Sequence, residues 1–169
     1  MVAKGFSLIE LMFTVVIAAV LAAIAAPYFR DILLNNQITS YTNNMVRAAY
    51  AARIEAIKRT EQIRISPIDS ADAADEWGPG LVVYLDVNAN SAFDSGTDEE
   101  IRTIPAVQGN QTINGPDGVT GFDFLPGGGV IATSLPVTFQ ICDGRTGETG
   151  RAVTITQRGE VRTSSVSCG

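Results

Sequence analysis

The sequence predicts an α+β fold in which a long N-terminal α-helix packs on an antiparallel β-sheet domain. One observation is an apolar run over residues 6–26, beyond which apolar residues keep helical spacing to about Arg59. The other is that from Gln62 onward the chain consists of short alternating runs separated by Gly, Pro, Asn and Asp. This second pattern is typical of strands joined by turns.

Composition limits what the chain can do. It has 169 residues, of which 12 are basic and 18 acidic, and it has no histidine. About 110 residues follow the helix, enough for one domain with a modest core. The net charge of −6 does not favour non-specific attraction to nucleic acid or anionic lipid. Without histidine the commonest general base and transition-metal ligand are missing. We expect neither an enzyme nor a cofactor.

The apolar run can cross a membrane. Phe6 to Ala26 is 21 residues with one charge, Glu10, and as a helix spans roughly 30 Å. Lys4 ahead of it predicts, by the positive-inside rule, that the rest of the chain lies outside the cytoplasm. A carboxylate in an apolar helix costs roughly 2.5 to 3.5 kcal/mol on insertion scales, so Glu10 needs a partner. For Glu10, the alternative is an acid that is tolerated near the membrane edge. For the apolar run, the alternative is a signal peptide that is cleaved near Ala26.

The stretch Lys4-Gly5-Phe6-Ser7-Leu8-Ile9-Glu10-Leu11 resembles the processing site of type IV prepilins and type II secretion pseudopilins. The resemblance implies that a prepilin peptidase cuts after Gly5 and methylates the new N-terminus at Phe6. It also implies that Glu10 pairs with the N-terminal amine of a neighbouring subunit and sets the axial register of a filament. Glycine suits the cut because it has no side chain to obstruct an extended backbone.

Four segments are then expected: a prepilin leader over 1–5, a membrane and filament helix over 6–26, its amphipathic continuation over 27–60, and a β-rich head domain over 61–169. The continuation is predicted to be one helix with the first, kinked near Pro27. A coiled-coil seam is the weaker alternative because sustained heptads are missing. The predicted apolar stripe consists of Leu34, Ile38, Tyr41, Met45, Ala48 or Ala49, Ala52 and Ala56. The opposite, polar face carries Asn36, Asn43, Arg47 and Lys58.

Eight strands are expected in the head domain, packed as an antiparallel sheet on the helix. Pro126 to Gly129 reads as a turn, because three glycines without a following helix do not make a phosphate loop. The expected strands are Gln62–Ser66, Gly80–Asp86, Glu100–Ile104, Gln111–Asn114, Gly121–Leu125, Val137–Cys142, Ala152–Thr156 and Glu160–Thr163.

The distal motifs narrow the resemblance to the GspH/FimT group of minor pilins and pseudopilins, which includes FimU-like proteins. This resemblance implies a pilin-type fold and a structural role at or near the tip of a filament. There the subunit helps to start the assembly of a type IV pilus or a type II secretion pseudopilus, together with other minor and major subunits. It also implies a single-pass inner-membrane protein with a periplasmic head that later reaches the pilus and cell surface. The motifs are Trp77-Gly78-Pro79-Gly80-Leu81-Val82-Val83-Tyr84, Asp86-Val87-Asn88-Ala89-Asn90, Asp98-Glu99-Glu100-Ile101-Arg102, Phe139-Gln140-Ile141-Cys142-Asp143 and Gly150-Arg151-Ala152-Val153-Thr154-Ile155.

The two cysteines, Cys142 and Cys168, lie on the side of the membrane predicted to be oxidising, where they most simply pair with each other. A bridge closing about 25 residues is worth roughly 3 to 4 kcal/mol in the loop-entropy model. Two unrelated reduced thiols are the alternative.

An acidic stretch offers a weak calcium candidate. Asp86, Asn88, Asn90 and Asp94 match positions 1, 3, 5 and 9 of a calcium loop, but Ser91 and Thr97 stand where glycine and a bidentate glutamate are wanted. The other interpretation is a solvated hairpin connection. Nine acids and no Lys or Arg fall between Arg64 and Arg102, so this face would repel DNA.

The C-terminal part is locally basic, with Arg145, Arg151, Arg158 and Arg162. Some FimT-like proteins bind DNA during natural transformation through a C-terminal Gly-Arg-x-Arg stretch. The matching positions here read Gly159-Glu160-Val161-Arg162, so an acid replaces the first arginine and weakens phosphate attraction. The alternative to a DNA-binding minor pilin is that these arginines lie on a solvated sheet edge and discourage strand addition.

Overall fold

The computed structural model describes residues 6–68, 77–116, 118–145, 147 and 149–168. It divides the chain into two compact units, one ending at Gln37 and one beginning at Ile38. A single helix, α1 (Leu8–Arg59), contributes residues to both. The helical continuation to Arg59 is therefore confirmed, and Pro27 lies inside the helix without ending it.

The first unit contains the start of α1. Ser7 is the N-cap residue, because its Oγ accepts a hydrogen bond from the backbone N–H of Glu10 at 3.3 Å. The large apolar side chains of this unit are exposed, from Phe6 to Leu33. By length and composition, α1 is able to cross a membrane. An exposed apolar helix of this kind needs lipid or other helices around it.

In the second unit, α1 buries one face. The buried residues recur at threes and fours and are Ile38, Thr42, Met45, Ala48, Ala49, Ala52 and Ala56. Thr42 was not predicted, and the predicted Leu34 and Tyr41 are only half-buried. Asn43, Arg47 and Lys58 are exposed, as expected for the polar face. The alanines leave room for strands to lie close against the helix. Thr42 is tolerated there because its hydroxyl donates to the carbonyl oxygen of Ile38 at 2.7 Å.

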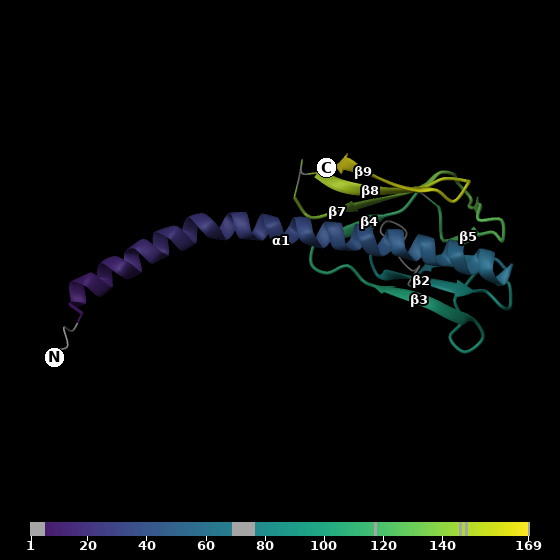
Figure 1. Cartoon of the computed structure of the whole chain (residues 1–169), viewed down its shortest axis with the longest axis horizontal. Helices are drawn as coiled ribbons and strands as arrows, with labels where there is room; N and C mark the ends of the chain where they lie inside the picture. The colour runs from purple at the N-terminus through teal and green to yellow at the C-terminus, as the bar shows by residue number, and fades with distance from the viewer. Residues whose placement is uncertain (1–5, 69–76, 117, 146, 148, 169) are drawn as a thin grey trace. The chain divides into compact units, whose positions relative to one another are not determined.

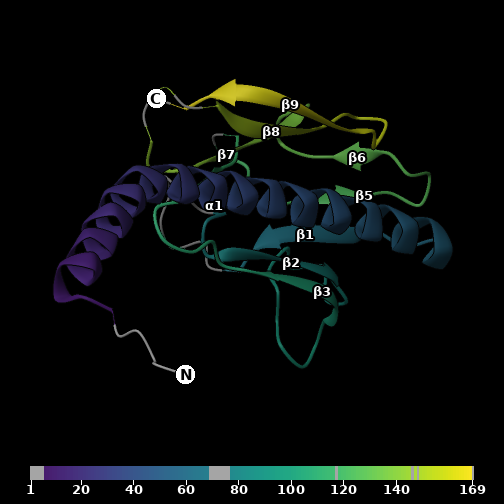
Figure 2. The same ribbon diagram turned by 60° about the vertical axis from the view of Figure 1, so that its left-hand side comes forward.

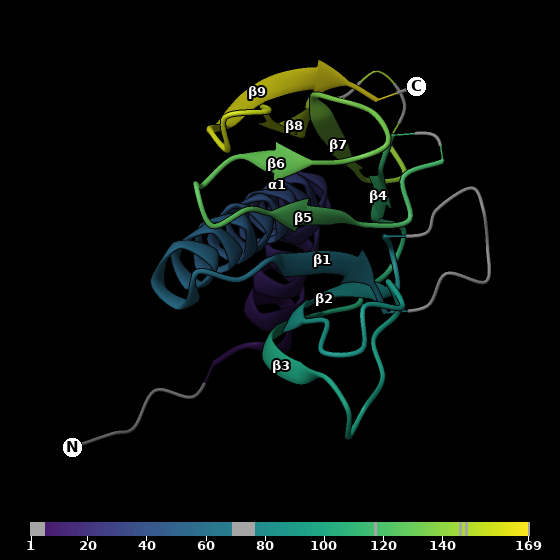
Figure 3. The same ribbon diagram turned by 90° about the vertical axis from the view of Figure 1, so that its right-hand side faces the viewer.

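The strands form two antiparallel sheets, where one sheet was predicted (Figures 1 and 3). The five-stranded sheet has the order β3-β2-β1-β5-β6 and consists of β1 (Ile63–Pro67), β2 (Gly80–Leu85), β3 (Glu99–Pro105), β5 (Phe122–Phe124) and β6 (Val130–Ile131). The four-stranded sheet has the order β4-β7-β8-β9 and consists of β4 (Thr112–Asn114), β7 (Val137–Cys142), β8 (Thr149–Ile155) and β9 (Val161–Ser167).

All eight predicted strands are present, but their bounds differ and one strand was missed. β6 has only two residues, too few for a visible alternation. β8 begins earlier and β9 ends later than predicted, because Thr149–Ile155 pairs along its whole length with Val161–Ser167. The serines late in β9 are poor strand formers on their own, so pairing with β8 extends the strand.

The core lies between both sheets and the α1 segment that begins at Ile38 (Figures 2 and 3). Its centre is aromatic: the Trp77 ring lies 4.7 Å from that of Phe139 and 6.2 Å from that of Phe122, measured between centroids. Gly115 packs directly on the Trp77 indole, where a Cβ would lie 2.3 Å from Nε1. All three aromatic side chains are fully buried, so this cluster holds the two sheets together.

A second link joins the sheets at the turn between β8 and β9. The N–H of Val130 donates to the carbonyl oxygen of Gln157 at 2.9 Å, and Arg53 Nη1 donates to that of Gly159 at 2.9 Å. Gly159 has φ 72°, and a Cβ there would lie 2.1 Å from the carbonyl oxygen of Gly128. The glycine of the Gly159-Glu160-Val161-Arg162 stretch is therefore required by the fold.

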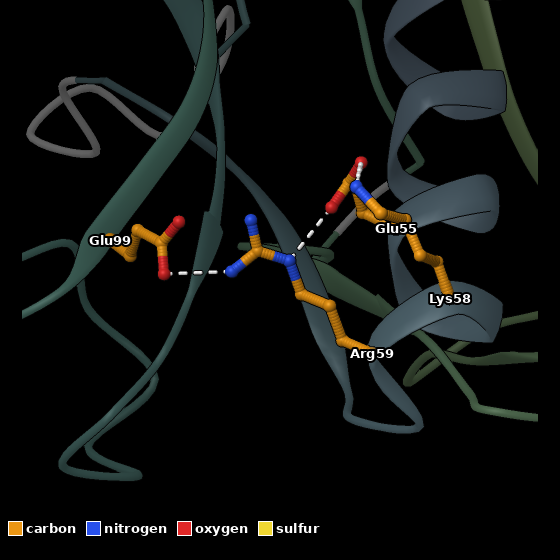
Figure 4. A network of polar contacts seen from close by, with 4 residues as sticks. All are labelled: Glu55, Lys58, Arg59 and Glu99. Atoms are coloured by element: carbon orange, nitrogen blue, oxygen red, sulfur yellow. Dashed lines mark hydrogen bonds and ion pairs between the residues drawn. The ribbon is translucent and has the colours of Figure 1, made fainter.

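The C-terminal end of α1 is tied to β3 by a charged network (Figure 4). Arg59 donates from Nε to Glu55 and from Nη1 to Glu99, each at 2.7 Å, and Lys58 also contacts Glu55. The hydrogen bonds from Arg59 lower the pKa of both carboxyls. Lys58 and Arg59 also suit the negative end of the helix dipole.

Candidate assembly site and distal sites

The residues predicted to direct assembly lie at the start of α1. Glu10 is in the first helical turn and Phe6 is 81% exposed just ahead of the N-cap. Glu10 has no ion-pair partner among the residues that the structure describes, and a carboxylate at this position suits the positive end of the helix dipole. Gly5, the predicted cleavage residue, lies outside the described residues. The apolar stretch over residues 6–26 thus offers one carboxylate, Glu10, on an otherwise apolar surface.

Cys142 and Cys168 form a disulfide, with their Cα atoms 5.9 Å apart. The bond joins the end of β7 to the residue that follows β9. Gly150 lies against it, since a Cβ there would be 2.4 Å from the Cys168 Sγ. The bond ties the C-terminal strand to the centre of its sheet, and glycine at position 150 leaves the space that the two sulfurs occupy.

A buried ion pair beside the disulfide was not predicted. The Asp143 side chain is 2% exposed and accepts hydrogen bonds from Arg145 Nε at 3.0 Å and Nη2 at 2.7 Å. These bonds lower the pKa of the Asp143 carboxyl, against the opposite effect of burial. Both residues line a polar cleft of about 220 Å³ that also contains the two cysteines. Arg145 is thus engaged within the fold.

We expect Asp143→Asn to lower the stability of the head at pH 7 by about 1 to 2 kcal/mol, because charge-assisted hydrogen bonds to Arg145 are lost. A carboxyl with a lowered pKa stabilises the fold above its unfolded pKa and loses that contribution as pH falls. The difference in Tm between the wild type and this variant should therefore shrink below about pH 4.

Thermal melts followed by circular dichroism at several pH values measure this difference in Tm. Glu160→Gln, which alters an exposed pair with Arg162, is the control and should change Tm little. A difference that persists at low pH would contradict the assignment.

The calcium candidate lies in the connection between β2 and β3, as predicted for a hairpin. Its polar groups bond to one another: the Asp86 carboxylate accepts the N–H of Ser91 at 2.7 Å, and Asp94 accepts the side-chain amides of Asn88 and Asn90. Across the part of the chain that the structure describes, no three carboxylate or thiolate side chains gather closely enough to hold a metal ion. Calcium is not part of the function that we propose.

The four C-terminal arginines do not form one patch. Arg145 and Arg151 lie toward the disulfide end of the β8–β9 hairpin, whereas Arg158 is in its turn and Arg162 is next to that turn. Arg151 shares a face of β8 with the buried Val153, while Arg162 pairs with Thr154 on the other face. Arg162 also contacts Glu160 at 3.0 Å. Of the four arginines, only Arg158 and Arg162 lie at the turn end of the β8–β9 hairpin.

Comparisons with known proteins agree with these features. The family model described as Type II transport protein GspH matches residues 41–159, and the prokaryotic N-terminal methylation motif matches residues 1–26. A curated relative, the type IV narrow pilus major component PilA5 of Thermus thermophilus, is 38% identical over 80 residues, which cover 44% of this chain and 69% of the relative.

Solved structures share the fold. The type IV minor pilin FimU of Pseudomonas aeruginosa has a TM-score of 0.60 at 22% identity, covering 82% of this chain and 92% of FimU. The minor pseudopilin EpsH of Vibrio cholerae has a TM-score of 0.53 at 13% identity, covering 76% and 93%. At these identities the likeness concerns the fold alone.

The GspH match over residues 41–159 includes β1 to β8 and most of the helical face that packs on them, but it ends before β9. It covers more than half of the chain. The methylation motif covers the capped start of α1, Glu10 and the exposed apolar helix. Such proteins are structural subunits and not enzymes. The chain belongs to the GspH family of type IV pilin-like minor pilins and pseudopilins.

Proposed function

We propose that this chain is a minor pilin or minor pseudopilin that sits at or near the tip of a type IV pilus or type II secretion pseudopilus and helps to initiate its assembly. Prepilin peptidase cuts after Gly5, and the chain waits in the inner membrane with its head in the periplasm. It then leaves the membrane when Glu10 pairs with the N-terminal amine of a neighbouring subunit.

One observation carries this proposal: a single carboxylate, Glu10, interrupts an exposed apolar helix near its N-terminus. In lipid or in a helical bundle that charge is costly unless a cation neutralises it. An amine at Phe6 of a neighbouring subunit would supply the cation, and only if the two helices are offset along their axes. The carboxylate therefore selects one axial register.

The periplasmic orientation is supported by two features. Lys4 precedes the apolar run, and Lys or Arg on that side favours the cytoplasm. The Cys142–Cys168 disulfide lies in the head, and such bonds persist in oxidising compartments. The position near the tip rests on membership of the GspH family.

Intact-mass and N-terminal peptide mass spectrometry of the chain purified from membranes test this function. We expect a mature N-terminus at Phe6 carrying one methyl group. Gly5→Val should retain the leader, because a branched side chain obstructs the extended backbone at the cut. A mature N-terminus at any other residue would refute the proposed processing.

A second candidate is a DNA-binding minor pilin, for which Arg158 and Arg162 at one exposed hairpin end are the specific observation. A mobility shift with the full chain in detergent tests it. Binding should weaken as salt rises and fall in an Arg158→Ala plus Arg162→Ala variant. Arg47→Ala, which removes an exposed cation from α1, is the matched control. No binding at low salt would end this candidate.

A further inference from the structure

The start of α1 is held by Ser7. Its Oγ accepts the N–H of Glu10 at 3.3 Å, and its carbonyl oxygen accepts the N–H of Leu11 at 3.2 Å. The helix itself begins at Leu8. The N–H groups of a first helical turn have no acceptor inside the helix, and a serine just ahead of that turn supplies one. Removing the Ser7 hydroxyl would leave the Glu10 N–H without this acceptor.

The residue that receives this hydrogen bond is the predicted register residue. Ser7 and Glu10 are three positions apart, which is the spacing of a capping box. In a capping box the glutamate side chain turns back toward the N–H of the capping residue. Helical side chains lean toward the N-terminus of their helix, which favours the same direction for Glu10. The capped turn therefore limits the positions that the Glu10 carboxylate can reach.

Ser7 also stands between that carboxylate and the predicted N-terminal amine. Phe6 directly precedes Ser7, lies outside the helix and is 81% exposed. A helical residue adds about 1.5 Å along the axis, whereas an extended residue adds about 3.3 Å. If the helix start moved by one residue, the amine would therefore shift relative to Glu10. A filament whose register depends on both groups needs the same offset between them in every subunit.

The capped turn also suits Glu10 before a neighbour arrives. No cation pairs with Glu10 in the part of the chain that the structure describes. A lone carboxylate is costly in lipid. Hydrogen bonds from backbone N–H groups and the positive end of the helix dipole reduce that cost, and both require an ordered first turn.

We propose that Ser7 is a positioning residue for filament assembly. By capping α1 it holds the Glu10 carboxylate and the Phe6 amine at one fixed offset, so that each meets its counterpart on a neighbouring subunit. The proposal rests on the proposed function, in which Glu10 pairs with that amine. Ser7 acts through the first turn of its own helix. Threonine is able to replace it because its hydroxyl is also an N-cap acceptor, whereas alanine has none.

Hydrogen exchange followed by NMR on the full chain in detergent micelles tests the cap itself. Ser7→Ala should make the Glu10 amide exchange on the order of tenfold faster than in the wild type, because that amide loses its acceptor. Ser7→Thr should leave the rate close to that of the wild type. Thr14→Ala, which removes a hydroxyl bonded to Leu11 one turn along the same helix, is the control and should not alter it. Equal exchange in Ser7→Ala and the wild type would overturn the proposal.

Entry into filaments tests what the cap does. Immunoblots of sheared filaments and of membranes from the same cells measure it, expressed per chain cleaved at Phe6, because Ser7 is the second residue after the cut. Ser7→Ala should enter filaments several-fold less than the wild type, whereas Ser7→Thr and Thr14→Ala should enter normally. A defect in Ser7→Thr as large as that in Ser7→Ala would contradict a capping role.

A double variant separates positioning from a general effect on the helix. In a Glu10→Ala background, Ser7→Ala should cause little further loss, because a positioning residue acts through the group that it positions. Additive losses would overturn the proposal. If Ser7→Ala enters filaments normally while Glu10→Ala does not, the role of Ser7 is wrong and the proposed function stands. Normal entry of Glu10→Ala would instead refute the register role, and with it any role of Ser7 that acts through Glu10.

Discussion

Glu10→Ala should leave the chain cleaved and membrane-bound but reduce its presence in assembled filaments by more than about tenfold. The substitution removes a charge that lipid disfavours, so insertion and cleavage should not suffer. In the filament it leaves the neighbour's amine without a counter-ion, and breaking a buried pair by removing one partner is strongly destabilising. Immunoblots of sheared filaments and of membranes from the same cells measure the two pools.

Thr14→Ala is the matched control for this experiment. Thr14 lies one turn further along the same helix, and its hydroxyl bonds the carbonyl oxygen of Leu11 at 2.8 Å within its own chain. Losing it should not alter assembly. Normal incorporation of Glu10→Ala would remove the register role while leaving the processing site and the family assignment intact.

Trp77→Ala should destabilise the head by about 3 to 5 kcal/mol, the usual cost of emptying a large aromatic site in a core. Trp77 is 1% exposed and touches aromatic residues from both sheets, namely Phe122 of β5 and Phe139 of β7. A loss of this size is a large fraction of the stability of a small domain. Thermal unfolding followed by circular dichroism measures it, since the only tryptophan is removed.

Two further variants separate packing from general sensitivity. Tyr50→Ala removes an aromatic side chain that is 45% exposed on the outer face of α1 and should change Tm little. Gly115→Ala should be destabilising because its methyl group meets the Trp77 indole, and much less so when Trp77 is already alanine. Additive effects of the two substitutions would contradict the packing described here.

The sequence predicted the structure best within a single helix, where the buried side chains recur at one fixed spacing. In α1, the residues at threes and fours from Ile38 to Ala56 are the ones that the head buries, because a helix turns by the same angle whatever it packs against. The Cys142–Cys168 pair followed from there being two cysteines and a predicted oxidising compartment.

Prediction was weaker where distant segments meet. Spacing alone suggested that four arginines could act together, yet β8 separates Arg151 from Arg158 along its length, and the alternation of the strand puts Arg151 and Arg162 on opposite faces. The bond from Arg145 to Asp143 was missed because burial decides whether two neighbouring charges pair tightly, and burial comes from strands far away in sequence.

The sequence by itself determined the family, the apolar helix, its single acid at Glu10 and the order of nearly all the strands, because these depend on local period and on motifs at fixed offsets. Only the tertiary structure decided that the strands divide into two sheets, that Gly159 and Gly115 are required for close contacts, and that β9 is left as an open edge. These depend on which segments meet across the core, and strand pairing over long separations leaves no periodic trace in the chain.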